Sequence, residues 1–383
     1  MGEPALTESR WRVPLADVVV GDELVEAVLD VVRSGWWSMG PRVEEFEHAF
    51  ADFTGAKHGV AVANGTAALH LALIAAGCGD GDEVVVPSLN FVAAANTIVH
   101  TGAEPVFCDI AGPGDLNLDP RDLESAVTER TRAVVVLHYG GHPCDMGAVL
   151  EIADRHRLVV VEDAAHAPGA KYEGRSCGTI GAAGCFSFFS NKNLPVGEGG
   201  MIVTDDDELA GRLRLLRSHG MTTLTWDRHR GHASGYDVLV PGFNYRLDEV
   251  RAATGLVQLR RLPEENRARA AVVARYRESL DGTSGLTMPF DTIEGREPVH
   301  HLAVVLLPEG TDRDQVRSGL AERGIQTSVH YSPIHGFSAY RSKPSRALPE
   351  TDAVAARLLT LPLYGGLADG QVDAVVEGLL YTL

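Results

Sequence analysis

The sequence is poor in cysteine, in long apolar runs and in basic residues, and each shortage excludes a class of protein. Its 383 residues include five cysteines, with no CxxC pair, so we expect reduced thiols and neither a disulfide framework nor a metal site. The sequence has no run of about 18 apolar residues, the length needed to span a membrane. The N-terminus lacks the apolar stretch of a signal peptide. We therefore expect a cytoplasmic protein.

Basic residues are also scarce relative to acidic ones. The chain has 34 Lys and Arg against 52 Asp and Glu, a formal net charge of −18. Nucleic acid and anionic membrane surfaces both require a basic footprint, so neither is expected as a partner. A small phosphorylated ligand stays possible because it needs only a few local donors.

Short apolar runs alternate with helical stretches from about residue 59 to 204. Seven runs are predicted as strands: 59–63, 83–86, 105–109, 133–138, 158–162, 185–189 and 201–204. Continuous β-branched runs are typical of strands covered on both faces. Because helical stretches separate most of them, we predict an α/β fold with a mostly parallel seven-stranded sheet between helices. Ligands of such sheets bind beyond the carboxyl ends of the strands.

The pattern changes after about residue 255. The elements expected there are a long charged helix at 259–280, strands at 301–307 and 326–330, and helices at 313–323, 351–359 and 371–380. They predict a smaller C-terminal α/β domain. We thus divide the chain into a large domain, 13–255, and a small domain, 256–383.

Two polar sites follow predicted strands of the large domain. Gly65 and Thr66 open a helix, where free N–H groups and the helix dipole can bind an anion or serve only as a cap. Asp163 ends an apolar strand, and His166 lies three residues on, facing the same side if the segment is helical. A cap or salt bridge would be the ordinary role of such an aspartate.

Lys192 lies in a glycine-rich loop after the apolar strand at 185–189. A loop lysine is ordinarily a solvated surface charge, but one held against an apolar wall can lose its charge and act as a nucleophile. An amine, a strand-end carboxylate and an anion cup are the three groups that pyridoxal phosphate requires for its aldehyde, ring nitrogen and phosphate. We therefore predict this cofactor.

The sequence resembles the DegT/StrS-type nucleotide-sugar aminotransferases in five segments: VANGTAALHLAL, VPSLNFVAAAN, VEDAAHAPGA, SFFSNKNLPVGEGGMIVTDD and PGFNYRLDEVRAA. These are fold-type-I pyridoxal-phosphate enzymes. The resemblance implies that L-glutamate or L-glutamine donates an amino group, held on the pyridoxamine form of the cofactor, to a nucleotide-linked keto sugar. It also implies a homodimer with shared active sites.

The resemblance assigns a role to each matching residue. Lys192 would be the Schiff-base lysine and the base that moves the proton, Asp163 would pair with the ring nitrogen, and His166 would lie near the 3-hydroxyl. The remaining cofactor-binding positions are Gly65, Thr66 and Ser187 for the phosphate, Phe91 for stacking on the ring, and Asn244 for the phosphate of the neighbouring subunit. Asn90 and Asn191 stand where family members often have threonine.

The substrate is less determined than the cofactor. His330 and Tyr331 match a segment near the family's sugar site, whereas Arg228 lies in a basic segment that could equally be a surface loop. We expect an NDP-4-keto-6-deoxyhexose giving a 4-amino-4,6-dideoxy sugar, because 3-amino-forming relatives often have Gln at the position of His166. A 3-keto sugar or a keto-cyclitol is the alternative.

Two other classes of protein are alternatives to the aminotransferase. A non-catalytic regulatory protein that binds pyridoxal phosphate would keep the fold without turnover, but the intact set of Lys192, Asp163 and Ser187 argues against it. A nucleotide-dependent dehydrogenase is excluded because no GxGxxG motif follows a strand and opens a helix.

Overall fold

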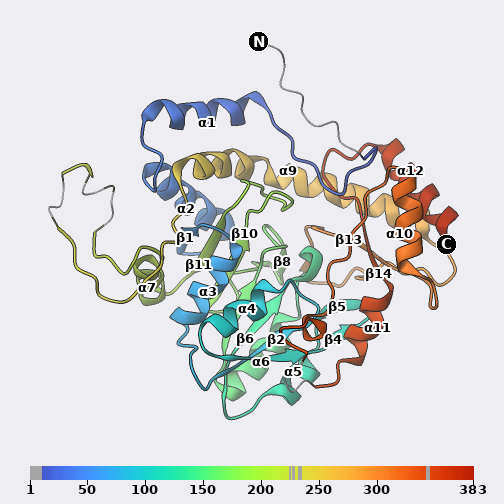
Figure 1. Cartoon of the computed structure of the whole chain (residues 1–383), viewed down its shortest axis with the longest axis horizontal. Helices are drawn as coiled ribbons and strands as arrows, with labels where there is room; N and C mark the ends of the chain where they lie inside the picture. Colours follow the sequence, from blue (N-terminus) through green and yellow to red (C-terminus); the bar gives the residue numbers. More distant parts are fainter. Residues whose placement is uncertain (1–10, 224–225, 227–228, 232–234, 342–345) are drawn as a thin grey trace.

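The computed structural model describes residues 11–223, 226, 229–231, 235–341 and 346–383. At its centre is a seven-stranded sheet of order β1-β11-β10-β7-β6-β2-β3 (Figure 1). The strands are β1 (His58–Val62), β2 (Glu83–Pro87), β3 (Glu104–Cys108), β6 (Thr131–Leu137), β7 (Val159–Asp163), β10 (Ala183–Ser187) and β11 (Gly200–Thr204). All neighbours are parallel except those of β11, which runs against β1 and β10. The predicted mostly parallel seven-stranded sheet is confirmed.

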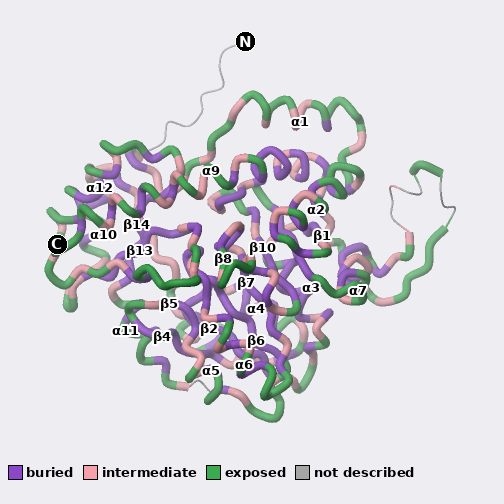
Figure 2. The backbone as a smooth tube through the Cα atoms, turned by 180° about the vertical axis from the view of Figure 1, so that it is seen from behind, coloured by how far each residue is buried: buried purple, intermediate pink, exposed green. Residues whose placement is uncertain are grey.

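The sheet is buried on both faces, as its β-branched runs predict. On β2, Val84 and Val86 pack into the cluster that holds α3 (Gly65–Ala75), α4 (Ala93–His100) and α7 (Asp207–Arg217). Val85, between them, faces the opposite side and packs with α5 (Pro120–Ala126) and α6 (Met146–His156). This alternation follows from the two-residue period of a strand, and Figure 2 shows the strands as the buried centre of the chain.

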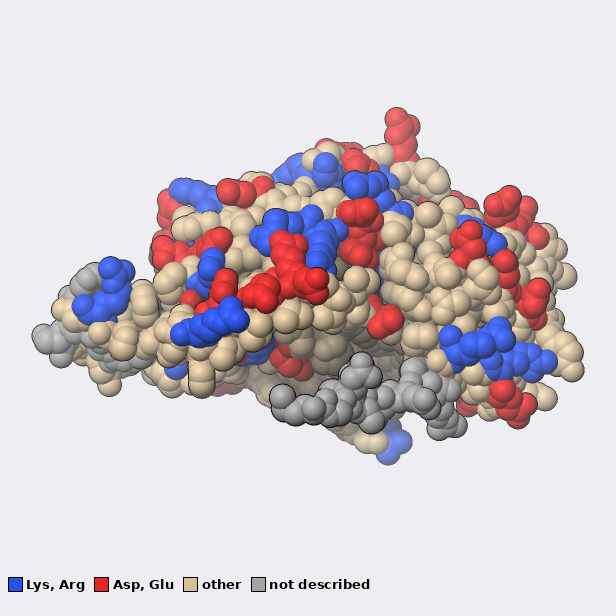
Figure 3. Space-filling view, turned by 90° about the horizontal axis from the view of Figure 1, so that it is seen from above, with Lys and Arg blue, Asp and Glu red and all other residues tan. Residues whose placement is uncertain are grey.

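Two N-terminal helices, α1 (Asp22–Ser34) and α2 (Pro41–Thr54), are not among the predicted elements. Helix α1 lies on the outside of α9 (Figure 1) and buries only Val31. Ion pairs hold α1 against α9: Glu23 contacts Arg260 at 2.6 Å and Arg261 at 3.7 Å. Seen from this side, acidic and basic side chains lie next to one another (Figure 3), so the net charge does not make this face uniformly acidic.

Helix α9 (Glu249–Leu280) joins the sheet to the C-terminal part of the chain. It begins ten residues before the predicted helix, capped by the Asp248 carboxylate on the Arg251 N–H. Its first half packs on the sheet through Ala252 and Leu256, and its second half packs on the C-terminal elements through Tyr276. The helix thus crosses the proposed domain boundary at 255/256, which stays a prediction.

The C-terminal part contains a two-stranded sheet of β13 (Ala303–Leu306) and β14 (Leu358–Leu361). Helices α10 (Arg313–Glu322), α11 (Pro349–Arg357) and α12 (Asp369–Thr382) surround it. The strand predicted at 326–330 is wrong: Ser328 makes a single bridge to Thr360. Beyond that bridge the His330 carbonyl accepts from the Tyr139 hydroxyl, so its hydrogen bond goes to a side chain and not to β14.

Short elements complete the fold. They are the hairpin of β4 (Ile110–Gly112) and β5 (Asp115–Leu118), the small sheet of β8 (Lys171–Tyr172), β9 (Arg175–Ser176) and β12 (Arg296–Glu297), and the 3₁₀ turns Tyr139–Gly141 and Ile334–Gly336. Within the described ranges, the helices are all too short or too polar to cross a membrane.

Candidate active site

A cavity of about 400 Å³ opens at the carboxyl ends of β7 and β10. It lies where parallel strands are expected to present their ligand-binding edge. Nine of the predicted site residues line it: Gly65, Thr66, Phe91, Asp163, His166, Ser187, Lys192, His330 and Tyr331. The tertiary structure therefore brings together residues that span most of the chain.

The N-terminus of α3 forms an anion cup at one end of the cavity. The Asn64 side chain caps the helix by accepting from the Ala67 N–H at 2.8 Å, which leaves the earlier N–H groups of Gly65 and Thr66 outside the intrahelical pattern. A Cβ on Gly65 would lie only 2.7 Å from the Cβ of Ser187. Glycine at this position therefore lets the Ser187 hydroxyl lie against the helix N-terminus, a fitting site for a phosphate.

Asp163 ends β7 and is 5% exposed. Burial raises the pKa of its carboxyl above the ordinary value, although the Ala165 N–H, Lys192 and Asn90 oppose that rise. The Ala165 N–H donates to Oδ1 at 3.2 Å. A buried carboxylate that retains room for a further partner is suited to a cationic ligand group such as a protonated ring nitrogen.

Lys192 lies in the loop after β10 with its side chain partly exposed and its amine enclosed by protein. Desolvation lowers the pKa of the amine to about 8, and the charge of Asp163 works in the opposite direction. A substantial fraction of the amine is therefore uncharged slightly above neutral pH. Its Nζ lies 3.4 Å from Nε2 of His301.

His166 is held in one tautomer by the backbone. Its Nδ1 accepts from the Gly140 N–H at 3.2 Å, so the proton of the neutral ring is on Nε2, which donates to the Tyr331 hydroxyl at 2.9 Å. Burial and the charge of Lys192 hold the pKa of His166 well below its usual value. The ring is thus a neutral donor that faces the cavity.

The predicted sugar-binding pair reaches the same cavity from the C-terminal part of the chain. Nδ1 of His330 lies 3.1 Å from Oγ1 of Thr360, and burial lowers the pKa of His330 to about 4. The ring of Tyr331 lies 5.9 Å from that of Phe91, which is 55% exposed. These residues form the wall and mouth of the cavity.

Two predicted residues are not placed in the cavity. Asn244 is exposed, forms a β-bridge with Ser218 and is not among the residues that line the cavity. Arg228 lies outside the described residues. Their assigned contacts stay predictions.

Sequence reasoning missed His301 and Asn193. His301 is 5% exposed and lies two residues before β13, and its Nδ1 lies 3.0 Å from Oδ1 of Asn193. A histidine at the start of an apolar strand was a usable signal, because a buried polar residue needs a partner. Its partner lies 108 residues away in the chain, which the sequence pattern does not reveal.

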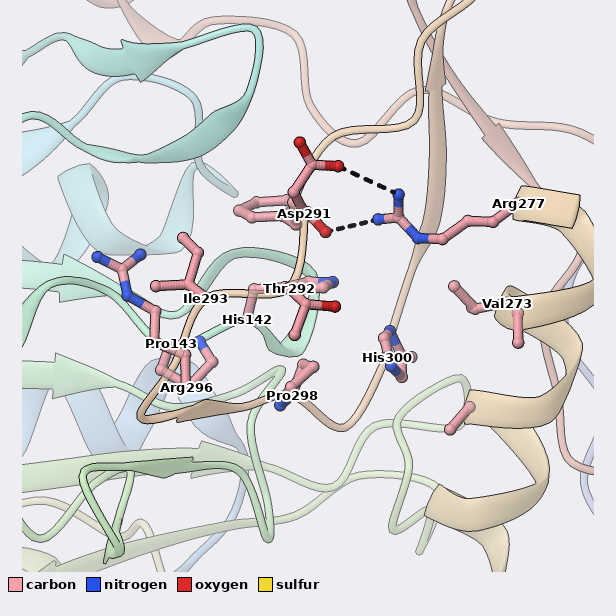
Figure 4. A pocket seen from close by; sticks show the side chains of 13 residues that line it. His142, Pro143, Val273, Arg277, Asp291, Thr292, Ile293, Arg296, Pro298 and His300 are labelled. Atoms are coloured by element: carbon pink, nitrogen blue, oxygen red, sulfur yellow. Dashed lines mark hydrogen bonds and ion pairs between the residues drawn. The ribbon is translucent and has the colours of Figure 1, made fainter. Parts of the chain in front are cut away.

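A second cavity, of about 200 Å³, lies between α9 and the segment at 290–300 (Figure 4). Its basic groups are occupied within the chain: Arg277 points towards Asp291, 4.0 Å away, and donates to the Phe290 carbonyl, while Arg296 pairs with Asp115 at 2.7 Å. None of the predicted site residues lines it. In the part of the chain that is described, no group of three His, Cys, Asp or Glu side chains could hold a metal ion.

The donor set of the first cavity fits pyridoxal phosphate. It offers a desolvated amine, a buried carboxylate, a glycine-lined helix N-terminus, and a buried Oδ1 of Asn191 with no partner among the described residues. Together with the mostly parallel sheet, these features define a fold-type-I pyridoxal-phosphate enzyme.

Comparison with known proteins agrees. Residues 19–380 match the model of the DegT/DnrJ/EryC1/StrS aminotransferase family, and the chain belongs to that family. It is a pyridoxal-phosphate-dependent sugar aminotransferase. The chain is similar to the spore coat polysaccharide biosynthesis protein SpsC of Bacillus subtilis, with 44% identity over 372 residues that cover 95% of each chain.

Solved structures show the same similarity. The aminotransferase TlmJ of Streptoalloteichus hindustanus is 37% identical, with a TM-score of 0.90 over 97% of this chain and 98% of that one. The putative sugar aminotransferase Spr1654 of Streptococcus pneumoniae, solved in its PMP form, is 29% identical, with a TM-score of 0.91 over 97% and 99%.

Proposed function

We propose that the protein transfers an amino group from L-glutamate or L-glutamine to a nucleotide-linked keto sugar. The proposed acceptor is an NDP-4-keto-6-deoxyhexose, and the product is a 4-amino-4,6-dideoxy sugar. The observation that carries the proposal is the enclosure of Lys192, Asp163 and the His166–Tyr331 pair in one cavity. The name of the Bacillus subtilis relative, a polysaccharide biosynthesis protein, supports a sugar acceptor.

Each group of the cavity has one task in this reaction. Pyridoxal phosphate, when bound, would supply a protonated ring that serves as the electron sink for proton removal from the carbon bearing the amine. Asp163 balances the positive charge of the ring nitrogen. Lys192, whose pKa is about 8, accepts and returns the proton at near-neutral pH, and its fixed place in the cavity makes that transfer effectively intramolecular.

The remaining predicted residues bind and orient. The N–H groups of Gly65 and Thr66 and the hydroxyl of Ser187 would hold the phosphate, and Phe91 would contact the ring. The Nε2–H of His166 would donate to the 3-hydroxyl oxygen of the cofactor in place of the Tyr331 hydroxyl. Tyr331 is then available to a hydroxyl of the sugar.

A second copy of the chain is part of the proposal. Lys192 is the single Lys or Arg in the described lining of the cavity, which also holds Asp163 and Glu198. A nucleoside diphosphate needs additional cations or N–H donors. We assign these to a homodimer in which Asn244, exposed in the single chain, reaches the phosphate site of the neighbouring copy, and to Arg228 at the sugar.

Product analysis tests the function. Purified protein is incubated with glutamate or glutamine and a panel of NDP-4-keto sugars, NDP-3-keto sugars and keto-cyclitols, and the products are identified by NMR. We expect amination at C4. A product aminated at C3, or an amino-cyclitol, would replace the proposed acceptor. A cofactor absorption band that responds to neither glutamate nor glutamine would overturn the proposed donors.

A further inference from the structure

His301 contacts the reacting amine although it lies outside the motifs that predict the site. Its Nε2 is 3.4 Å from Nζ of Lys192, and its ring centre is 4.4 Å from that of His166. The residue is buried two positions before β13, so this contact links the C-terminal part of the chain directly to the loop after β10.

A chain of side-chain amides determines which nitrogen of His301 carries the proton. Nδ2 of Asn266, on α9, donates to the Pro168 carbonyl at 3.0 Å, so its Oδ1 faces Nδ2 of Asn193 at 2.9 Å. That Nδ2 also donates to the Val299 carbonyl at 3.2 Å. Oδ1 of Asn193 must then accept from Nδ1 of His301, 3.0 Å away, because amide oxygens only accept.

Nε2 of His301 consequently carries no proton, and its lone pair faces Lys192. Burial and the charge of Lys192 hold the pKa of His301 well below its usual value, and His166, Arg269 and His330, which also face it, act in the same direction. The imidazole stays neutral at working pH, so it brings no second positive charge to the amine. Both the charged and the uncharged forms of a lysine have an N–H to donate to such an acceptor.

We propose that His301 is a positioning residue for Lys192. Its Nε2 accepts a hydrogen bond from Nζ, holds the amine at one place in the cavity and stabilises its protonated form, while Asn193 and Asn266 keep the ring in the accepting tautomer. The inference rests on the role of Lys192 in the proposed function, but it concerns the amine itself and applies before any substrate binds.

Competitive labelling of lysines in the full-length, cofactor-free protein tests the proposal. Acetic anhydride is applied across a pH series, and the labelled peptides are quantified by mass spectrometry, with exposed Lys171 as the internal reference. In His301→Leu the pKa of Lys192 should fall by about one unit, since a hydrogen bond to a charged group is worth about that much. His301→Gln, whose amide oxygen can take the place of Nε2, should restore most of the wild-type value.

The adjacent His300 supplies a matched control. It is partly buried, lines the second cavity and has a φ of 49°, which asparagine tolerates. His300→Asn should leave the pKa of Lys192 unchanged. An unchanged Lys192 pKa in His301→Leu would overturn the proposal. An equal shift in the Leu and Gln variants would also overturn it, because the loss of the ring, and not of the hydrogen-bond acceptor, would then change the pKa.

Two further measurements keep the proposal falsifiable. If His301→Leu does not fold, Asn266→Ala, which breaks the amide chain without touching Lys192, should lower the lysine pKa in the same direction by a smaller amount; no shift would overturn the proposal. In the holoenzyme, a pH titration of the absorption band of the bound cofactor should rank the variants in the same order. Failure of the proposed acceptor would appear only in product analysis and would leave these results standing.

Discussion

The Tyr331 hydroxyl accepts a hydrogen bond from Nε2 of His166 at 2.9 Å, although 165 residues separate the two in the chain. His166 follows β7 of the central sheet, whereas Tyr331 comes from the segment before the 3₁₀ turn at Ile334–Gly336. The contact closes one wall of the cavity that holds Lys192 and Asp163. It places the group expected at the cofactor next to the group expected at the sugar.

Replacing Lys192 by alanine should abolish multiple turnover. The amine is the proposed proton carrier, and positioned proton transfer contributes roughly 10²- to 10⁴-fold to a rate; we expect a loss at the upper end of that range. Steady-state assays with glutamate and keto sugar measure it, with Lys171→Ala, at an exposed position, as the control. Many turnovers by Lys192→Ala would refute the assigned role.

Asp163→Asn should lower kcat by roughly 100- to 1,000-fold, the range expected when one preorganised electrostatic contact is lost. An amide is neutral and cannot balance the charge of a protonated ring nitrogen. Because burial already raises the pKa of the Asp163 carboxyl, removing the charge should not lower the melting temperature of the cofactor-free protein. A variant that loses stability and activity together would point to a structural role instead.

The reaction of the cofactor-free protein with pyridoxal phosphate should depend on pH through Lys192. Only the unprotonated amine attacks the aldehyde, and burial lowers the lysine pKa to about 8. The rate of cofactor uptake should therefore rise with pH and level off above about 8, as followed by absorbance. A rate that keeps rising towards about pH 10, the ordinary lysine value, would show that the amine is not desolvated.

Gly65→Ala should weaken cofactor binding by about 10- to 100-fold. The new Cβ would lie 2.7 Å from the Cβ of Ser187, and relieving such a clash costs about 1–3 kcal/mol. Gly211→Ala in α7, where a Cβ meets nothing within 4 Å, is the matched control and should bind normally. Equal affinities for pyridoxal phosphate in the two variants would argue against the anion cup.

Arg228→Ala and His330→Ala should each raise the KM for the keto sugar about tenfold, the effect of losing one hydrogen bond to a charged group. The KM for the amino donor should not change, because the assigned contacts are with the sugar nucleotide. Separate kinetics for the two half-reactions distinguish these effects. An unchanged sugar KM in both variants would remove both residues from the proposed site.

Local sequence patterns predict much of the architecture. The valines of β2 form a continuous apolar run that predicts a strand covered on both faces, and Val84 and Val85 do pack into opposite layers. By contrast, the residues at 326–330 have a strand-like composition, yet they form a single bridge. Contacts of His330 with Tyr139 and Thr360 override that local preference. Nothing in the sequence of the segment predicts those contacts.

The sequence by itself determined the chemical groups: the loop lysine, the strand-end aspartate and the glycine that opens α3 follow from residue type and from position next to a strand. Only the tertiary structure decided how these groups behave. Desolvation of Lys192, the tautomer of His166 and the lone pair of His301 depend on atoms brought together from distant parts of the chain. Burial and hydrogen bonding at that distance set the pKa values and proton positions, because electrostatic interactions depend on separation in space and not along the sequence.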